Sequence, residues 1–228
     1  MLVRIPGVLP TEQSAEIAAR LQSADDSWVD GRITAGFQGE PVKRNRQIDE
    51  RSPLARELGG IVLAALERHP RFISAALPAR VYPPMFNRYE SGMQFGAHVD
   101  GAIRLIPGSG TKLRTDVSAT LFLSPKDSYE GGELLIEDTY GTHSVKLDAG
   151  DLALYPATSL HRVAPITRGV RLASFFWVQS MIADDAKRTL LFDLDNAIQR
   201  LGATAADSDA RTALIGTYHN LLRMWAEV

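Results

Sequence analysis

Apolar positions recur with a helical period in the first third of the chain. Ile17 and Leu21 stand four residues apart after Pro10-Thr11, which predicts a helix over about residues 11–23. Ser52-Pro53 then offers a hydroxyl N-cap followed by a first-turn proline. Helical spacing continues from there through Leu54, Leu58, Ile61 and Ala65. We expect this second helix to end before Pro70, and residues 24–50 to be irregular.

Short runs typical of β-strands fill residues 79–180. Glycine and aspartate turn signals separate the runs, which are RVYPPMFNRYE, DVSATLFLSP, GGELLIED, HSVKL, DLALYP, LHRVAPI and VRLASFFWVQS. About seven short strands in a hundred residues predict two packed sheets. The expected fold class is therefore mainly β with flanking helices, built on a double-stranded β-helix (jelly roll) core.

The helical period returns after Ser180. Asp184 and Asp185 stand where an N-cap belongs, and apolar residues follow at helical spacing up to Gly202. A last helix carries Leu214, Leu222 and Trp225, which suit a homo-oligomer interface as well as a core. We expect a helical and irregular segment over 1–78, a jelly-roll domain over 79–180 and a helical extension over 181–228.

Composition and charge narrow the function classes. The net charge of 228 residues is −2, which gives no drive toward nucleic acid or an anionic membrane, and we expect neither as a partner. The absence of cysteine excludes disulfides, zinc-thiolate sites, iron–sulfur clusters and thiol nucleophiles. The apolar N-terminus is interrupted by Arg4 and Pro6, and no run approaches the length of a membrane span. A cytoplasmic protein is expected.

His98-Val99-Asp100, followed by His161, carries the strongest chemical signal. Residues two apart on an extended segment project to one side, and Gly96 and Gly101 let the backbone approach closely. Two imidazoles and one carboxylate can hold one face of an octahedral Fe(II) and leave three positions open. The alternative is that His98 and Asp100 form a surface pair and that His161 is a core histidine. The tripeptide alone does not decide between them.

Arg171 opens a strand whose alternation places it with Ala173, Phe175 and Trp177. A guanidinium beside such an apolar face is costly unless an anion pairs with it. If the APITRGV connection is a hairpin with an odd loop centred on Thr167, Arg171 lies on the same face as His161, roughly 8–9 Å away. That distance suits a five-carbon dicarboxylate that chelates the metal. An even loop would turn Arg171 outward.

From Tyr89 to Trp177 the sequence resembles the prolyl-4-hydroxylase-like branch of the Fe(II)/2-oxoglutarate dioxygenases. The elements that carry the resemblance are YESGMQFGAHVD, SATLFLS, EGGEL, DAGDLALYP and SLHRVAPITRGVRLASFFW. The helices on both sides and the stretch GRITAGFQ make it similar to the bacterial PKHD-type hydroxylases, which are often associated with siderophore-iron uptake. The resemblance covers essentially the whole chain.

The resemblance implies an oxidoreductase that decarboxylates 2-oxoglutarate to succinate, consumes O2 and hydroxylates a substrate C–H bond. It implies His98, Asp100 and His161 as iron ligands and catalytic residues, and Arg171 as the partner of the distal carboxylate of 2-oxoglutarate. Tyr89 matches a position that often lines the cosubstrate pocket, although a buried strand aromatic is an equal alternative. The resemblance also implies L-ascorbate (vitamin C) as a supporting cofactor, on which no residue reports.

Some relatives place a tyrosine in the strand that corresponds to SATLFLS, where this chain has Leu121 and Phe122. This departure leaves the second contact to the distal carboxylate unassigned. His69, His143 and His219 lack an acid two residues on and are assigned to structure.

Two basic stretches could touch a substrate. The first holds Arg32, Lys43, Arg44 and Arg46, and the second holds Arg104, Lys112 and Arg114. Residues 102–115 follow Asp100 directly and have the glycine content of a mobile lid for an anionic or oxygen-rich substrate. A solvated loop is the other interpretation.

The substrate stays open among a peptide, an amino acid and a siderophore-type molecule. Two other functions share the motif: a non-catalytic jelly-roll sensor of iron or 2-oxoglutarate, and an AlkB-like nucleic-acid demethylase. The lack of a basic surface argues against the demethylase.

Overall fold

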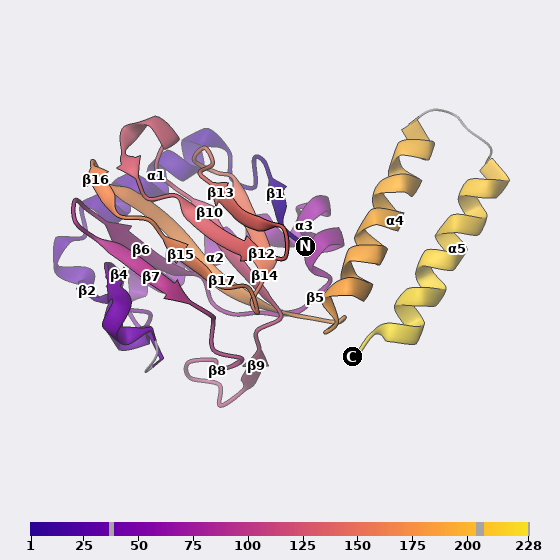
Figure 1. Ribbon diagram of the computed structural model, residues 1–228, viewed down its shortest axis with the longest axis horizontal. Helices are drawn as coiled ribbons and strands as arrows, with labels where there is room; N and C mark the ends of the chain where they lie inside the picture. Colours follow the sequence, from indigo (N-terminus) through magenta and orange to yellow (C-terminus); the bar gives the residue numbers. More distant parts are fainter. Residues whose placement is uncertain (37–38, 204–207, 228) are drawn as a thin grey trace.

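Two antiparallel sheets face each other in the computed structural model, which describes residues 1–36, 39–203 and 208–227 (Figure 1). The larger sheet has eight strands in the order β1-β14-β10-β17-β6-β4-β2, with β5 paired to β17. Its strands are β1 (Val3–Ile5), β2 (Trp28–Asp30), β4 (Arg46–Ile48), β5 (Pro78–Val81), β6 (Met85–Tyr89), β10 (Val117–Phe122), β14 (Leu152–Pro156) and β17 (Arg171–Ser180). The two facing sheets confirm the predicted double-stranded β-helix.

The smaller sheet has five strands in the order β13-β12-β15-β7-β3. They are β3 (Lys43–Arg44), β7 (Gln94–His98), β12 (Leu134–Asp138), β13 (Gly141–Val145) and β15 (His161–Val163). Two short ribbons complete the β structure. One pairs β8 (Ile103–Leu105) with β9 (Lys112–Arg114), and the other pairs β11 (Glu130–Gly131) with β16 (Ile166–Arg168).

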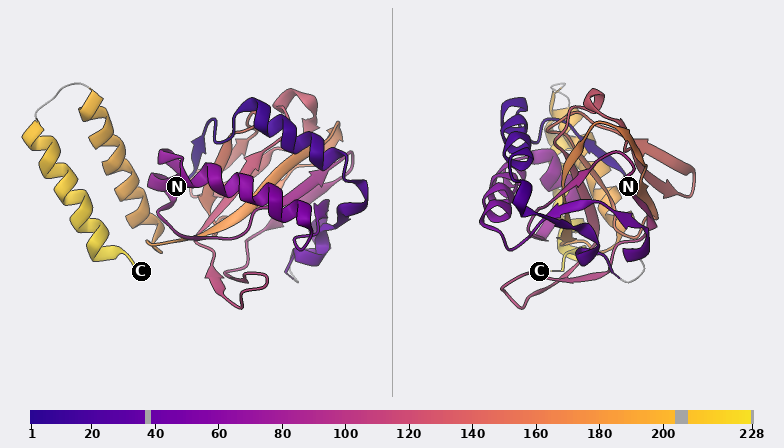
Figure 2. Two further views of the ribbon diagram at one scale, coloured as in Figure 1. Left: turned by 180° about the vertical axis from the view of Figure 1, so that it is seen from behind. Right: turned by 90° about the vertical axis from the view of Figure 1, so that its left-hand side faces the viewer.

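Helices α1 (Thr11–Gln22) and α2 (Pro53–Glu67) lie along the outer face of the larger sheet (Figure 2). The predicted bounds of both are confirmed, and the Ser52 hydroxyl accepts a hydrogen bond from the Ala55 N–H, as expected of an N-cap. Ile17 and Leu58 belong to one buried cluster with Leu121 and Leu172 of the sheet. Because the larger sheet is covered on both faces, β10 is buried at every position and shows no polar alternation.

A third helix, α3 (Pro70–Ala76), was not expected from the sequence. Pro70 does end the preceding helical pattern, but it also occupies the first turn of α3, where its missing N–H costs nothing. His69 is the N-cap of α3, and its Nδ1 accepts a hydrogen bond from the Phe72 N–H at 3.4 Å. His69 therefore has a structural role, as predicted, but it caps the start of α3 and does not belong to the end of α2.

The C-terminal extension forms an antiparallel pair, α4 (Asp185–Ala203) and α5 (Ser208–Trp225), that projects from the sheets (Figure 1). The Asp184 carboxylate accepts a hydrogen bond from the Lys187 N–H, which confirms the predicted N-cap. No described helix has the length and apolar character of a membrane span.

Candidate metal and cosubstrate site

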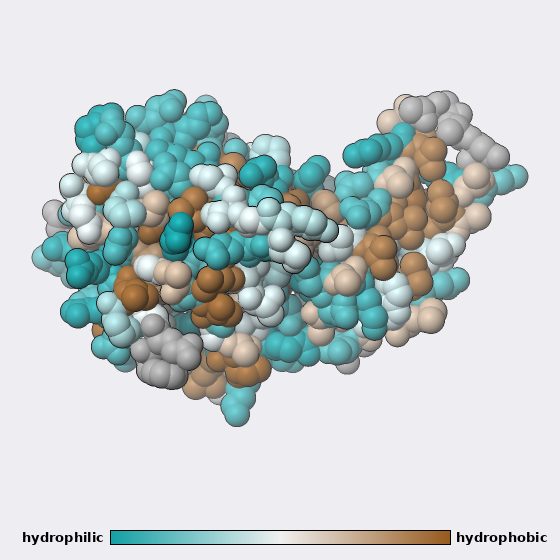
Figure 3. Space-filling model, viewed as in Figure 1, coloured by the Kyte–Doolittle hydropathy of each residue, from teal (hydrophilic) through white to brown (hydrophobic). Residues whose placement is uncertain are grey.

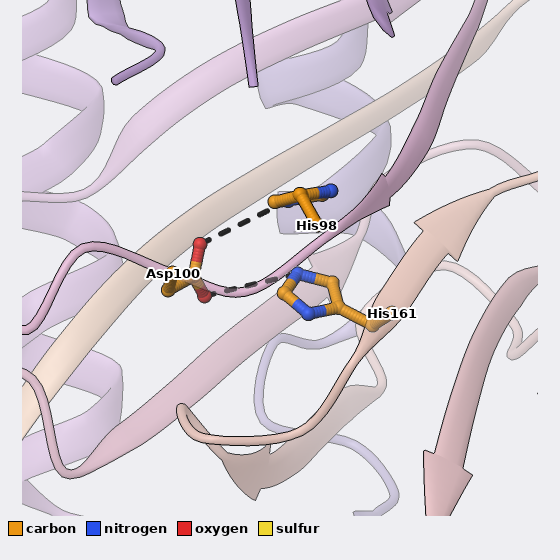
Figure 4. Close-up of side chains that lie close together, drawn as sticks. All are labelled: His98, Asp100 and His161. Carbon is orange, nitrogen blue, oxygen red and sulfur yellow. Dashed lines mark ion pairs between the residues drawn. The ribbon is translucent and has the colours of Figure 1, made fainter. Parts of the chain in front are cut away.

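His98, Asp100 and His161 come together between the two sheets (Figure 4). His98 ends β7 and lies directly opposite His161 of β15 in the antiparallel register, so both imidazoles leave the same face. Asp100 follows two residues after His98. The Asp100 carboxylate oxygens lie 3.9 Å from His98 Nε2 and 3.7 Å from His161 Nε2. One metal ion with bonds of about 2.0–2.2 Å could lie within reach of all three side chains.

Backbone and side-chain contacts orient all three groups. The Nδ1 atoms of His98 and His161 lie 2.8 and 3.0 Å from the carbonyls of Gly96 and Ser159. A protonated Nδ1 donates to such a carbonyl, which leaves each Nε2 with a free lone pair toward Asp100. The Ser118 hydroxyl, on β10 of the larger sheet, donates to the Asp100 carboxylate at 2.5 Å.

The three groups open into a cavity of about 750 Å³ between the sheets. Arg171 and Tyr89 line it from the larger sheet, and both are almost wholly buried. The Arg171 guanidinium carbon lies 5.4 Å from the Tyr89 ring centre and 5.2 Å from that of Phe122. Arg171 Nε and Nη1 are buried without a hydrogen-bond partner. A buried guanidinium in this state requires an anion.

The path by which Arg171 reaches the cavity differs from the predicted one. The APITRGV connection is not a hairpin between neighbouring strands, because its central residues form β16, which pairs with β11. β15 therefore stays in the smaller sheet, whereas β17 pairs with β6 and β10 in the larger sheet. Arg171 approaches from the opposite wall, so the strand-spacing argument for its distance from His161 does not apply, although Arg171 and His161 line the same cavity.

Glycine at position 132 allows Ile166 and Tyr129 to pack closely against Arg171. Gly132 has φ +69°, and a Cβ there would come within 2.3 Å of Ile166 and 3.0 Å of Arg171 Cδ. Tyr129, from the same loop, is buried beside Arg171, and its hydroxyl has no hydrogen-bond partner. Tyr129 does not line the cavity itself. Phe122 of the SATLFLS strand faces Arg171, whereas Leu121 belongs to the cluster under the helices.

The segment that joins the two sheets adds three polar groups to the cavity, of which only Lys43 was a candidate from the sequence. Lys43 of β3 pairs with β7, and Gln47 of β4 pairs with β6, so residues 43–48 close one edge of the β-helix. Lys43, Asn45 and Gln47 alternate into the cavity, whereas Arg44 and Arg46 are exposed. This period of two is visible in the sequence KRNRQ and was the signal available.

Burial changes the acidity of several cavity groups. It raises the pKa of Tyr89 to about 12 and raises that of Tyr155 further, so both phenols stay protonated. It lowers the pKa of His98, with a further contribution from His161, so the neutral imidazole is favoured. Burial, with the positive charge of Arg104, lowers the pKa of Lys43 to about 7.

The two basic stretches contribute unequally. Arg104 lines the cavity, but Arg114 forms ion pairs with Asp116 and Glu227, and Lys112 is exposed and outside the cavity lining. Of the three cations in the second stretch, only Arg104 therefore faces the cavity. Arg32 is paired with Asp30. Phe37 and Gln38, the end of the GRITAGFQ stretch, lie outside the described residues.

Comparison with known families agrees with this geometry. Residues 84–179 match the model of the 2OG-Fe(II) oxygenase superfamily, and residues 185–227 match that of the PKHD-type hydroxylase C-terminal domain. Among solved structures, the match to a Pseudomonas putida prolyl-4-hydroxylase covers 78% of this chain and 92% of that protein, with 20% identity and a TM-score of 0.54. The match to a Trichoplax adhaerens prolyl hydroxylase covers 83% of this chain and 86% of that protein, with 17% identity and a TM-score of 0.55. These likenesses show the fold.

Full-length relatives are much closer in sequence. PKHD-type hydroxylases from Cupriavidus pinatubonensis and Burkholderia ambifaria are each 66% identical over 227 residues, and one from Saccharophagus degradans is 59% identical. In each case the match covers 100% of both chains. The chain therefore belongs to the PKHD-type hydroxylases of the 2OG-Fe(II) oxygenase superfamily.

Proposed function

We propose that His98, Asp100 and His161 hold the Fe(II) of this 2-oxoglutarate-dependent hydroxylase. The observation that carries the proposal is the cluster itself: two imidazoles with Nε2 directed at one carboxylate, inside a cavity between the sheets. This donor set of nitrogen and carboxylate oxygen suits Fe(II) and leaves positions open for other ligands. Ser118 keeps Asp100 oriented toward the histidines.

Arg171 is the proposed anchor for the distal carboxylate of 2-oxoglutarate. Its Nε and Nη1 groups, buried without a hydrogen-bond partner, supply charge-assisted donors for this carboxylate. Tyr89 stays protonated beside it and can donate a further hydrogen bond. Tyr129 packs behind Arg171 and holds it against the cavity wall, so we assign Tyr129 to positioning.

When bound, iron and 2-oxoglutarate supply the oxidising chemistry, in which O2 is consumed, 2-oxoglutarate yields succinate and CO2, and the substrate gains one hydroxyl. The chain's own residues bind and orient the cosubstrate, and they exclude water from the cavity. The aromatic walls Phe95, Tyr155 and Phe175 shield the cavity, and Arg171 fixes the cosubstrate at one end of it.

Several finer points of this function stay predictions. They are the substrate among peptides, amino acids and siderophore-type molecules, a link to iron uptake, L-ascorbate dependence, a cytoplasmic location, and self-association through the C-terminal helices. Family membership favours an enzyme over a non-catalytic sensor or an AlkB-like demethylase.

The first prediction tests the metal and cosubstrate assignments separately. His98→Ala should lower Mn(II) affinity, followed by electron paramagnetic resonance, at least about tenfold, and it should abolish succinate formation. Arg171→Ala should raise the KM for 2-oxoglutarate about 100-fold while Mn(II) affinity stays within about twofold, because charge-assisted bonds contribute about 1.5–3 kcal/mol. Arg171→Lys should rescue only part of this loss. Unchanged Mn(II) affinity in His98→Ala, or an unchanged KM in Arg171→Ala, would contradict the corresponding assignment.

A further inference from the structure

Two basic side chains that line the cavity have no role in the proposed binding of iron or 2-oxoglutarate. They are Lys43, from the segment that closes the β-helix edge, and Arg104, from the β8–β9 hairpin. The two approach the same short stretch of chain. Lys43 Nζ donates to the Thr34 hydroxyl at 3.1 Å, and an Arg104 guanidinium N–H donates to the Thr34 carbonyl at 3.5 Å.

Lys43 is held in place by its surroundings. Only 4% of its surface is exposed, and its ammonium lies 5.0 Å from the Phe95 ring centre and 5.8 Å from that of Phe175. The Phe95 ring in turn stacks on His98 at 3.5 Å between centres. The Phe95 ring therefore contacts both Lys43 and the proposed metal ligand His98. Lysine side chains are rarely buried this completely without a charged partner.

Arg104 is held in a comparable way at the cavity mouth. Its guanidinium carbon lies 4.0 Å from the Trp177 ring centre and 5.4 Å from that of Tyr82. These cation–π contacts hold the guanidinium beside the two rings, so its charge is in place before any ligand arrives.

The nearby carboxylates are already engaged. Asp100 belongs to the proposed metal site, Asp30 is paired with Arg32, and Glu50 accepts a hydrogen bond from the Tyr82 hydroxyl. Within the described part of the chain, neither Lys43 nor Arg104 has a carboxylate partner within 4.0 Å. Lys43 is buried and Arg104 is half-buried, and cations in such positions without an anion are costly to the fold and indicate an incoming negative charge.

We infer that the substrate carries an anionic oxygen group, a carboxylate or a phosphate, that binds between Lys43 and Arg104. The rest of the substrate meets an apolar rim, because Ile33, Val99, Ile103 and Leu105 line the cavity and are exposed at its mouth. Hydrophobic side chains gather over the β8–β9 region of the surface (Figure 3). The inference rests on the proposed function and names the substrate class of that site: an apolar acid, oxidised near its charged end.

The test uses the whole protein loaded with one equivalent each of Mn(II) and 2-oxoglutarate, under argon. Isothermal titration calorimetry compares three probes that share a phenylpropyl tail: 4-phenylbutanoate, the neutral 4-phenylbutanamide and 3-phenylpropyl phosphate. Each is titrated into the wild type, Lys43→Met, Arg104→Gln and the matched control Lys112→Gln. Lys112 lies on the same hairpin as Arg104 but outside the cavity lining.

The carboxylate or the phosphate should bind at least about tenfold more tightly than the amide, since a charge-assisted pair contributes about 1.5–3 kcal/mol. Lys43→Met and Arg104→Gln should each remove most of that advantage, and Lys112→Gln should keep it. Whichever anionic probe binds more tightly identifies the group. Equal binding of the amide, undiminished binding in both cavity variants, or no anionic probe bound below about 10 mM would overturn the inference.

The loading step separates this inference from the proposed function. Protein that takes up neither Mn(II) nor 2-oxoglutarate contradicts the proposed function before any probe is added. Variants that load normally but lose the anionic probe have kept their fold and the metal site, so their loss reports on Lys43 and Arg104 alone.

Discussion

At the scale of single residues, the candidate site depends on groups that hold other groups. The Ser118 hydroxyl donates to Asp100 across the gap between the sheets, and the carbonyls of Gly96 and Ser159 set the two histidine tautomers. Such partners typically contribute 10–100-fold to metal affinity in other proteins. Their effect can be measured without knowledge of the substrate.

Ser118→Ala should therefore weaken Mn(II) binding about tenfold, because the Asp100 carboxylate loses the donor that orients it. Ser174→Ala is the matched control. Ser174 is a buried hydroxyl on the neighbouring strand β17, without a hydrogen-bond partner and outside the cavity lining. Electron paramagnetic resonance titrations of both variants give the affinities. Equal affinities in Ser118→Ala and Ser174→Ala would show that Ser118 has no role in the metal site.

His98 should make the metal-free protein sensitive to acid. Burial and the nearby His161 lower the pKa of folded His98 to about 4 from the ordinary value of 6.5. The unfolded chain therefore binds more protons between these two pH values, and stability falls as the pH drops through that window. Each pKa unit of difference corresponds to about 1.4 kcal/mol. His98→Gln removes this contribution.

Urea unfolding at pH 7 and pH 5, with a chelator present, measures the effect. The wild type should lose more free energy of unfolding between the two pH values than His98→Gln does. Parallel losses in the two proteins would mean that His98 titrates normally in the fold.

At the scale of elements, sequence patterns predicted where strands and helices form better than which strands pair with one another. The periodic helix α1, the capped helices α2 and α4, and the seven runs of β-type residues follow local physics, namely caps, period and turn residues. The pairing of β15 with β7 and of β17 with β6 is non-local, so a hairpin between β15 and β17 was a reasonable but wrong expectation. His98, Asp100, His161 and Arg171 converge even so, because each faces the space between the sheets.

The β3–β4 segment shows what local pattern leaves out. Lys43, Asn45 and Gln47 alternate inward, but the sequence alone does not tell which face of an isolated two-residue strand is buried. Only the pairing of β3 with one sheet and β4 with the other turns this polar face into the cavity wall.

This arrangement has a cost in stability that can be measured. Burial lowers the pKa of folded Lys43 to about 7 from 10.5, so the unfolded chain binds more protons between these values and wild-type stability rises with pH across that window. Lys43→Met should raise the free energy of unfolding at pH 7 by about 1–3 kcal/mol, because it removes a buried charge. It should also flatten the pH dependence between 7 and 10.5.

Chemical denaturation at pH 7 and pH 10 provides the measurement, with Lys112→Met as the control for an exposed lysine. A destabilised Lys43→Met protein would show that Lys43 stabilises the fold through its contacts with Thr34, Phe95 and Phe175.

At the scale of the whole molecule, the C-terminal helices are tied to the β-helix at few points. α5 has no fully buried residue, and α4 and α5 project as a pair away from the sheets (Figure 1). Arg188 is buried at the base of α4, where it donates to the Ile182 carbonyl and the Asp185 carboxylate. Arg114 makes a second tie near the base of α4: it pairs with Asp116 at 2.7 Å and with Glu227, beyond α5, at 2.8 Å.

Arg114 thus connects the base of the β8–β9 hairpin, which carries Arg104, to the end of the C-terminal extension. Arg114→Gln should leave Asp116 without its cation, and Asp116 is nearly buried, so the free energy of unfolding should fall by about 1–2 kcal/mol. Hydrogen exchange should accelerate most in α5 and in β8–β9, while β10 and β17 keep their protection. Lys126→Gln, which breaks an exposed pair with Asp148, should leave stability almost unchanged, because solvent screens such a pair. If exchange in α5 is unchanged in Arg114→Gln, the extension is held by the packing of Ile182 and Leu191 against Leu77, with no contribution from this ion pair.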